Sequence, residues 1–293
     1  MADRGGEWVL GVLGGSGVYE IEGLEKREWR KVETPWGEPS DELLFGELNG
    51  LRLVFLPRHG RGHRVTPTKV NARANIDALK RAGCTDLLSL SAVGSLREDL
   101  PPGTFVIVDQ YIDRTFAREK TFFGEGLVAH VSMADPVDPR LAGLAAEAAR
   151  EAGATVVEGG TLLVMEGPQF STRAESELYR SWGCAVIGMT AMPEAKLARE
   201  AELPYASVCM VTDFDCWHQE HDAVEVSQVI AVMNENAAKA RETVKRLAGK
   251  LVAPRVPSPI DTCLDTAIMT APSARDPKLM HKLAAVAGRA LVK

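Results

Sequence analysis

The sequence has few cysteines and lacks the features of a secreted or membrane protein. Its 293 residues include five cysteines, widely spaced and without a C-x-x-C pair, so we expect reduced thiols rather than a disulfide framework. The N-terminal residues lack the basic start and apolar core of a secretory signal. No apolar run approaches the ~20 residues that span a bilayer. We therefore expect a cytoplasmic protein without membrane contacts.

Concentrated positive charge and metal-ligand motifs are also missing. The sequence has 34 Lys and Arg against 40 Asp and Glu, a net charge of -6, and no basic block that would suit a nucleic-acid backbone. Nucleic acid is therefore not an expected partner. The segment HQEH, from His218 to His221, is not an H-E-x-x-H motif, so we expect no metal site. Both histidines fit a surface loop best, although they could also approach a bound sugar.

The sequence does contain an alternation of short apolar runs and segments of helical period, which predicts an α/β domain. Strands are predicted at 8–15, 52–60, 85–95, 104–113, 160–168, 184–190 and 205–213. Helices are predicted at 69–84, 140–154, 192–203 and 224–251. We expect residues 1–251 to form one domain and residues 252–293 to form a C-terminal extension. Three prolines make the start of this extension extended or turning, and a weakly helical arm follows, packed on the core or on a neighbouring subunit.

Polar residues collect at the predicted strand ends, where ligands bind in open α/β sheets. GGSG, from Gly14 to Gly17, would let backbone N–H groups approach an anion. Arg58 with His59, Ser91 and Thr190 follow other strands. Each fits a plain turn or an exposed loop as well. Together, a glycine-serine loop, an arginine and hydroxyls favour a phosphate bound without metal.

Two carboxylates, Asp213 and Asp215, follow the apolar run PYASVCMV in the stretch TDFDCWH. If the stretch stays extended, both carboxylates point to one side and Phe214 points to the other, toward the core. In isolation, a surface turn with solvated acids is the better explanation of the pair, since ionised side chains are mostly exposed.

Several longer motifs occur in a fixed order. Together they resemble the methylthioadenosine phosphorylase branch of the trimeric purine nucleoside phosphorylase family, over about residues 9 to 250. The motifs are GVLGGSGVYEIEGL, TPWGEPSD, LPRHGRGHRVTPTKVNARANIDALK, SAVGSLREDLPPG, MEGPQFSTRAES, GMTAMPEAKLAREAELPYA and TDFDCWH.

The resemblance implies one α/β domain around a mixed, partly barrel-like sheet flanked by helices, and an assembly of three identical subunits. It also implies a metal-free reaction of purine and methionine salvage. S-methyl-5'-thioadenosine and inorganic phosphate would give adenine and 5-methylthioribose 1-phosphate. Phosphate would be a co-substrate, and no cofactor would be needed.

The resemblance also implies roles for individual residues. Phosphate would be held by Ser16, Arg58, His59, Ser91, Thr190 and the backbone of Ala92. Ser16 and Ser91 stand where threonine is common, but both keep the hydroxyl. The nucleoside would contact Met189 below the ribose, Phe170 and Ser171 beside the base, and Asp213 and Asp215 at the purine edge. The methylthio group would meet Val226, Val229 and Ile230, which by their spacing alone would simply pack the helix on the sheet. His130 would reach in from the next subunit.

Breaking an N-glycosidic bond leaves cationic character on the sugar and negative charge on the purine. A buried carboxylic acid can protonate the leaving purine at N7, and we expect Asp213 to do so. Asp215 would accept a hydrogen bond from the 6-amino group of adenine. Two alternatives stay open: a related phosphorylase that prefers 6-oxo nucleosides such as methylthioinosine, inosine or guanosine, and a non-catalytic nucleoside-binding module.

Overall fold

The computed structural model describes residues 6–15, 17–218, 226–251 and 253–291, and it describes the backbone alone at 226–231. Within these residues the strands are β1 (Val9–Gly14), β2 (Glu25–Arg30), β3 (Leu43–Leu48), β4 (Leu51–Pro57), β5 (Asp86–Ser95), β6 (Thr104–Val108), β7 (Gln110–Asp113), β8 (Thr155–Glu158), β9 (Thr161–Val164), β10 (Val186–Gly188) and β11 (Tyr205–Asp213). The α-helices are α1 (Ala72–Arg81), α2 (Pro139–Glu151), α3 (Arg173–Ser181), α4 (Ala191–Glu200), α5 (Val226–Lys250), α6 (Pro277–Lys282) and α7 (Ala284–Leu291). Short 3-10 helices are η1 (Pro67–Lys69), η2 (Pro259–Asp265) and η3 (Pro272–Ala274).

The described strands form one mixed sheet in which β5 is the central member. The main path runs β2-β3-β4-β1-β5-β10-β9-β7, while β11 pairs with β5 and leads to β6 and β8. β5 lies parallel to β1 over its first half and to β11 over most of its length, and its last residues pair antiparallel with β10. The sheet therefore branches at β5. Its parallel and antiparallel pairs confirm the predicted mixed α/β fold.

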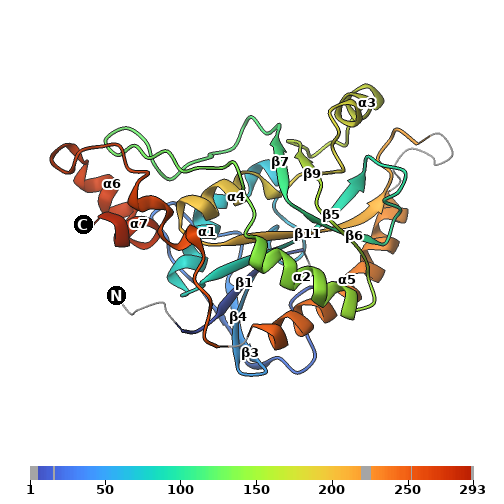
Figure 1. Ribbon diagram of the computed structural model, residues 1–293, viewed down its shortest axis with the longest axis horizontal. Coiled ribbons are helices and arrows are strands. Elements are labelled where there is room, and N and C mark those ends of the chain that lie inside the picture. Colours follow the sequence, from blue (N-terminus) through green and yellow to red (C-terminus); the bar gives the residue numbers. More distant parts are fainter. Residues whose placement is uncertain (1–5, 16, 219–225, 252, 292–293) are drawn as a thin grey trace.

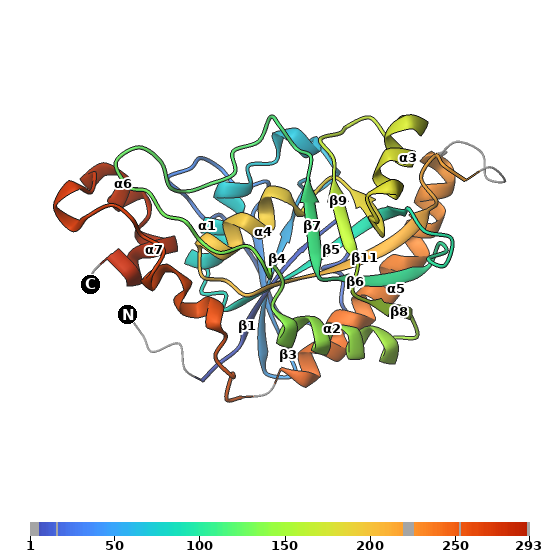
Figure 2. The same ribbon diagram turned by 45° about the horizontal axis from the view of Figure 1, so that its top comes forward.

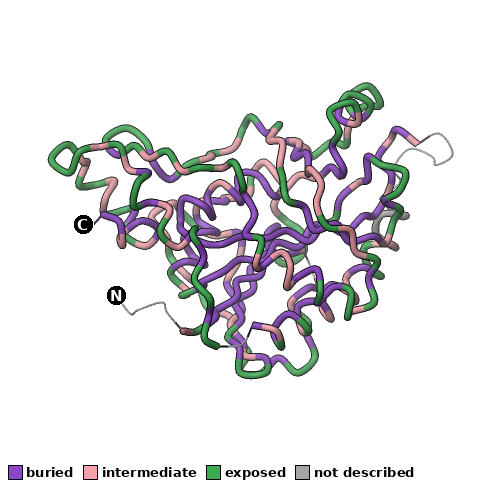
Figure 3. The backbone as a smooth tube through the Cα atoms, viewed as in Figure 1, coloured by how far each residue is buried: buried purple, intermediate pink, exposed green. Residues whose placement is uncertain are grey.

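Helices cover both faces of the sheet (Figures 1 and 2). α2 and α5 pack against each other and against β11 on one face, whereas α1 and α4 pack together on the other face with α7 beside α1. Each helical layer encloses its own set of buried apolar side chains. Figure 3 shows the strands largely buried, while α3 stands at an edge of the molecule and is mostly exposed.

The sequence predictions hold best for strands that bury both faces. The prediction of one strand at residues 104–113 was wrong. The chain leaves β6 at Val108 and enters β7 at Gln110, and the two strands pair with different partners. β2, β3, β8 and α3 were missed. β2 has the sequence EKREWR and is almost wholly exposed, so it carries no apolar alternation that could reveal it.

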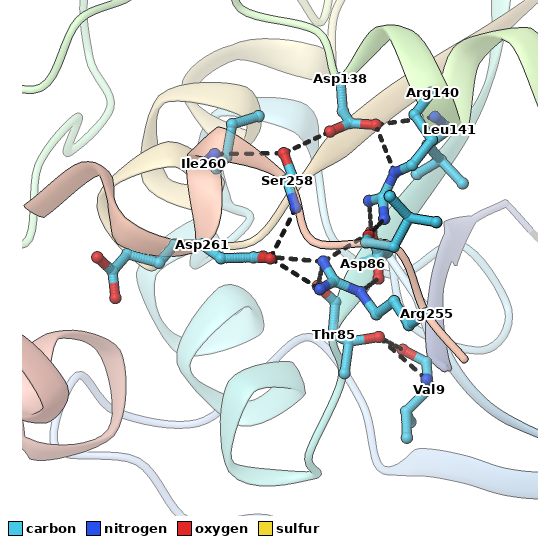
Figure 4. Close-up of polar contacts among 12 residues, drawn as sticks. Val9, Thr85, Asp86, Asp138, Arg140, Leu141, Arg255, Ser258, Ile260 and Asp261 are labelled. Atoms are coloured by element: carbon cyan, nitrogen blue, oxygen red, sulfur yellow. Dashed lines mark hydrogen bonds and ion pairs between the residues drawn. The ribbon is translucent and has the colours of Figure 1, made fainter. Parts of the chain in front are cut away.

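The C-terminal segment packs against the core of the same chain. Its buried apolar residues, among them Leu264, Leu283 and Val286, join the core of the α1/α4 face. Arg255 fastens the start of this segment (Figure 4): its guanidinium donates to both oxygens of Asp86, the first residue of β5, and to both oxygens of Asp261 in η2. Asp86 is fully buried and also pairs with Arg140 of α2.

Replacing Arg255 by methionine is expected to lower the free energy of unfolding by about 2–3 kcal/mol, because Asp86 stays buried after losing one of its two cations. A matched control is Arg246→Met, which breaks an exposed pair with Glu242 and is expected to cost less than about 1 kcal/mol. Urea unfolding of both variants provides the measurement. Equal losses would contradict a specific role for the buried clamp.

A long connection between β7 and α2 is anchored by Glu200 at the end of α4. The carboxylate accepts hydrogen bonds from the Phe122 backbone N–H at 2.7 Å and from the Thr121 hydroxyl at 2.7 Å. Burial raises the pKa of Glu200 to about 7, although both hydrogen bonds oppose this shift. The folded protein therefore binds this proton more tightly than the unfolded chain does.

Consequently, the free energy of unfolding should fall as pH rises from about 4.5 to about 7, by up to about 3 kcal/mol from Glu200 alone. Glu200→Gln should remove this pH-dependent contribution, because glutamine does not titrate. The fold should be kept, since the glutamine oxygen can still accept from Phe122 and its amide can donate to the Thr121 hydroxyl. Denaturant unfolding at several pH values tests this. Parallel pH profiles for the two proteins would rule it out.

Candidate active site

The first candidate element is the glycine turn that follows β1. Gly14 accepts a hydrogen bond from the Arg58 backbone N–H at 3.0 Å, which joins the carboxyl ends of β1 and β4. Gly17 has a φ of +90°, a conformation that glycine adopts without strain. Ser16, predicted to contact phosphate, lies outside the described residues. The turn therefore sits at the predicted edge of the sheet.

Arg58 lies directly beyond β4, but its guanidinium points into the protein. It donates to Glu194 at 2.8 and 3.1 Å, to the Ser89 hydroxyl at 2.7 Å, and to the carbonyls of Leu13 and Leu90. Arg58 is 2% exposed and Glu194 is 3% exposed. The arginine thus holds the ends of β1 and β4 to the middle of β5 and to the first turn of α4.

His59 is a neutral imidazole at the same edge. Its Nδ1 lies 2.9 Å from the carbonyl oxygen of Val65, and its ring stacks on His63 at 4.5 Å between ring centroids. Since a carbonyl can only accept, Nδ1 carries the proton. Burial, with the nearby Arg58 charge, lowers the pKa of His59 to about 4. Nε2 of the neutral ring can therefore accept a hydrogen bond, such as one from a monoprotonated phosphate.

Ser91 and Thr190 are brought together from distant parts of the chain. Their hydroxyl oxygens are 3.0 Å apart, although 99 residues separate them in sequence. Ala92 follows on β5, where it is exposed and pairs with Met210 of β11. Two hydroxyls at hydrogen-bond distance form a polar pair that could contact one small anion.

Asp213 ends β11 beside an irregularity in the sheet. Val211 pairs with Val93 and Asp213 pairs with Gly94, so Thr212 is an extra residue in the strand. Such bulges redirect the side chains that follow them. The Thr212 hydroxyl donates to Asp213 Oδ2 at 2.7 Å and the Asp215 backbone N–H donates to Asp213 Oδ1 at 2.8 Å. The Asp213 carboxylate is therefore held on both oxygens.

Asp215 approaches Asp213 through a turn and not through an extended strand, because its φ is +52°. Asp215 is 6% exposed, and its Oδ2 makes no standard hydrogen bond to any residue that the structure describes. Burial raises the pKa of Asp213, partly offset by its two donors. Burial also raises the pKa of Asp215; the Ser176 hydroxyl opposes this shift and the Asp213 charge adds to it. Both shifts favour the protonated forms of these two acids.

The acid pair borders the loop that precedes α3. Cys216 Sγ lies 3.3 Å from the Ser171 carbonyl oxygen, and the Ser171 hydroxyl lies 3.4 Å from the Met165 sulfur. Phe170 is half exposed, at 49%. Phe170 and Ser171 therefore lie beside the acid segment, and an aromatic ring is available to a flat ligand there.

The rest of the TDFDCWH stretch is structural. Phe214 is buried and packs edge-on against Trp217, whose indole N–H donates to the Ser95 carbonyl at 2.8 Å. His218 stacks on Phe214 and its Nε2 lies 3.1 Å from Glu98. His221 lies outside the described residues. The expectation that Phe214 faces the core is confirmed.

Met189 lies between β10 and Thr190, and its side chain packs over Gly167. A β-carbon at Gly167, where φ is +69°, would come within 2.5 Å of the Met189 sulfur. Glycine is therefore needed there, both for the backbone conformation and for the close approach of Met189. This contact joins Met189 to the segment MEGPQF.

Four predicted contacts stay predictions: His130, expected to act from a neighbouring subunit, and Val226, Val229 and Ile230. His130 is exposed, and its backbone N–H donates to the Ala267 carbonyl in the C-terminal segment. The side chains of Val226, Val229 and Ile230 lie outside the described residues, although their backbone forms the start of α5. Among described residues, no three His, Cys, Asp or Glu side chains gather as a metal-binding group, and no helix could cross a membrane.

Sequence reasoning missed the buried charges behind the site, namely Glu194, Arg118 and Glu166. In a helix or a loop such residues are ordinarily solvated, so nothing in the local pattern indicated burial. A signal was available for Glu166 and Glu194, since they lie within the quoted motifs MEGPQFSTRAES and GMTAMPEAKLAREAELPYA, but not for Arg118. Together with Thr212, these residues orient the contacts that were predicted.

The arrangement brings a pair of hydroxyls, a glycine turn and two buried carboxyl groups to one edge of the sheet. Ser91, Thr190 and the glycine turn offer donors to an anion, while Asp213 and Asp215 offer a buried acid and an acceptor. Such a site suits the transfer of a sugar from a nitrogen base to an anion, because the nucleophile and the leaving-group proton are supplied separately.

Comparison with known proteins agrees with this geometry. Residues 9–249 match the family described as the Phosphorylase superfamily. A protein of Cereibacter sphaeroides named S-methyl-5'-thioadenosine phosphorylase is 63% identical over 97% of this chain and 98% of its own. One of the same name from Rhodospirillum rubrum is 62% identical over 97% of each chain.

Comparison with solved structures leads to the same family. A methylthioadenosine phosphorylase from an antarctic soil metagenomic library superposes with a TM-score of 0.91 at 46% identity, covering 96% of this chain and 99% of its own. A mutant adenosine/methylthioadenosine phosphorylase of Schistosoma mansoni, in complex with adenine, gives a TM-score of 0.80 at 35% identity, covering 96% and 98%. This chain belongs to the Phosphorylase superfamily, in the branch of the S-methyl-5'-thioadenosine phosphorylases.

Proposed function

We propose that the protein catalyses the phosphate-dependent cleavage of S-methyl-5'-thioadenosine to adenine and 5-methylthioribose 1-phosphate, a transfer of a pentosyl group that serves purine and methionine salvage. The observation that carries the proposal is the buried pair of Asp213 and Asp215, in which Asp215 Oδ2 has no hydrogen-bond partner among the described residues. An unpaired buried acceptor is costly, and the 6-amino group of adenine would supply its missing donor.

Phosphate binds at the other end of the site in this proposal. Ser91 and Thr190 contact it with their hydroxyls, Ala92 and the glycine turn with backbone N–H groups, and Ser16 with its hydroxyl. Neutral His59 accepts from a phosphate O–H, while Arg58, paired with Glu194, supports these contacts from behind. Holding the nucleophile beside the sugar can contribute ~7–11 kcal/mol in favourable cases.

In the reaction, a phosphate oxygen forms a bond to C1′ as the bond from C1′ to the purine N9 breaks. The electron pair of that bond moves into the purine, which takes a proton from Asp213 at N7. The phosphate dianion stabilises the cationic sugar. Asp215 accepts from the 6-amino group and thereby favours adenine over a 6-oxo purine. Phosphate is the co-substrate, and the proposal requires no metal or cofactor.

The remaining contacts complete the nucleoside site. Met189 supports the ribose, and Phe170 with Ser171 borders the base. Val226, Val229 and Ile230 surround the methylthio group, where an unpaired hydroxyl would be disfavoured. We propose a cytoplasmic trimer in which His130 of a neighbouring subunit closes this end, and in which residues 1–251 form the catalytic domain and 252–293 an extension.

The test is a steady-state comparison of methylthioadenosine, adenosine and inosine, each with and without phosphate. We expect adenine release from methylthioadenosine that depends on phosphate, with much slower turnover of inosine. Faster turnover of inosine would indicate a 6-oxo nucleoside phosphorylase. Binding without phosphate-dependent cleavage would indicate a non-catalytic nucleoside-binding protein.

A further inference from the structure

Behind Met189 and Thr190 lies a buried ion pair that the reaction itself does not use. Arg118 belongs to the connection between β7 and α2, and Glu166 follows β9. The side chains are 5% and 9% exposed, and Arg118 Nε lies 2.9 Å from Glu166 Oε1. We call these two residues the strut.

Arg118 is hydrogen bonded through all three of its side-chain nitrogens. Nη1 donates to the carbonyl oxygens of Met189 at 2.6 Å and of Met192 at 2.8 Å, which lie on either side of Thr190. Nη2 donates to the carbonyl oxygen of Glu166 at 2.6 Å and, at 3.4 Å, to that of Met165. With Nε on the Glu166 carboxylate, the five N–H groups meet five acceptors. A rigid guanidinium thus fixes both flanks of Thr190 to the end of β9.

Glu166 is held just as firmly. Its Oε1 also accepts from the Thr68 hydroxyl at 2.6 Å, and its Oε2 accepts from the backbone N–H groups of Phe116 and Ala117 at 2.6 and 3.1 Å. Burial alone would raise the pKa of Glu166, but these hydrogen bonds and that from Arg118 outweigh it and hold the pKa at about 2. The carboxylate therefore stays ionised well below neutral pH.

The strut also reaches the buried pair behind the phosphate end. A small cavity is lined by Arg118, Thr190, Arg58 and Glu194 together. The segment 189–192 therefore borders the same cavity as Arg118 and the pair of Arg58 and Glu194. In the described structure no hydrogen bond or ion pair joins Asp213 or Asp215 to either buried pair; their segment rests on β5 and on the loop before α3.

We propose that Arg118, held by Glu166, is a positioning residue for phosphate, because it fixes the turn that presents Thr190 and Met189 to the phosphate and ribose. This inference rests on the proposed function for the identity of the anion. It predicts a separation of effects: loosening the strut weakens phosphate binding and leaves the adenine end, with Asp213 and Asp215, unchanged.

The test uses the conservative variant Arg118→Lys, which keeps the charge and loses the planar fork. We expect the dissociation constant of inorganic phosphate, measured by isothermal titration calorimetry, to rise about fivefold or more, as for the loss of about one hydrogen bond. The dissociation constant of adenine should stay within about twofold. In turnover, KM for phosphate should rise by the larger factor, and KM for the nucleoside by the smaller.

Two further variants keep the result interpretable. Thr68→Val removes only one donor to Glu166, so it should shift phosphate binding in the same direction by a smaller factor even if Arg118→Lys folds poorly. Arg150→Lys changes an exposed ion pair with Glu158 and should alter neither affinity.

An unchanged phosphate dissociation constant in both Arg118→Lys and Thr68→Val would overturn the inference. An equal loss of phosphate and adenine affinity would do the same. Absence of phosphate binding in the unmodified protein would overturn it too. If the unmodified protein binds phosphate but does not cleave methylthioadenosine, the proposed function fails, and the binding measurements still decide whether the strut positions the anion.

Discussion

Replacing Asp213 by alanine is expected to lower kcat by roughly 10²- to 10⁴-fold, the usual contribution of a positioned general acid. The change removes the proton source for N7 and also frees the Thr212 hydroxyl, but it leaves Ser91 and Thr190 in place. KM for phosphate should therefore change far less than kcat. Steady-state kinetics with methylthioadenosine at varied phosphate provide the measurement.

The pH profile gives a second signature of the same residue. Because the acid must be protonated to donate, kcat of the unmodified protein should fall as pH rises through the raised pKa of the acid pair. Asp213→Ala should lose this limb. Asp99→Ala, which removes an exposed partner of Arg97, is the matched control and should keep it. A variant that retains both its rate and its pH limb would exclude Asp213 as the acid.

Replacing Asp215 by asparagine is expected to change the choice of base more than the rate. Oδ2 of Asp215 is a buried acceptor without a partner in the described structure, which suits a 6-amino donor. An asparagine amide can instead donate to a 6-oxo group. We expect the preference for methylthioadenosine over methylthioinosine to fall by about 10²- to 10³-fold in kcat/KM.

Competition assays with the two nucleosides measure this preference directly. Asp99→Asn makes the same chemical change at an exposed site and should leave the ratio unaltered. An unchanged ratio in Asp215→Asn would assign base selection to another group. Together with Asp213→Ala, this variant separates proton donation from base recognition.

Elements whose local pattern matches their environment could be predicted from the sequence. β1, β4, β5 and β11 are apolar on both faces because both faces are buried, and their ends carried the polar residues that the fold gathers at one edge. The long helix α5 followed equally from its period. Of the predicted phosphate contacts, Ser91 and Thr190 do meet, as their place near the ends of predicted strands and the family resemblance both suggested.

What escaped prediction depends on contacts between distant segments. The bulge at Thr212 arises from pairing with β5 and leaves no mark in the order of residues. Arg118 and Glu166 are separated by 48 residues, and each in isolation fits a solvated charge. Asp215 was expected to align with Asp213 only if the chain stayed extended, whereas a left-handed turn brings the two together.

The length of β5 between Ser91 and Gly94 sets the spacing between the two ends of the site. Ser91 and Gly94, the partner of Asp213, lie three residues apart on this one strand, a separation of about 10 Å along a regular strand. In the proposed reaction, the separation between phosphate and purine is thus set largely by the backbone of this strand. Since a shift of one residue would turn Ser91 to the other face, an insertion or deletion between the two would abolish the site, while changes in loop length around it would alter only its access.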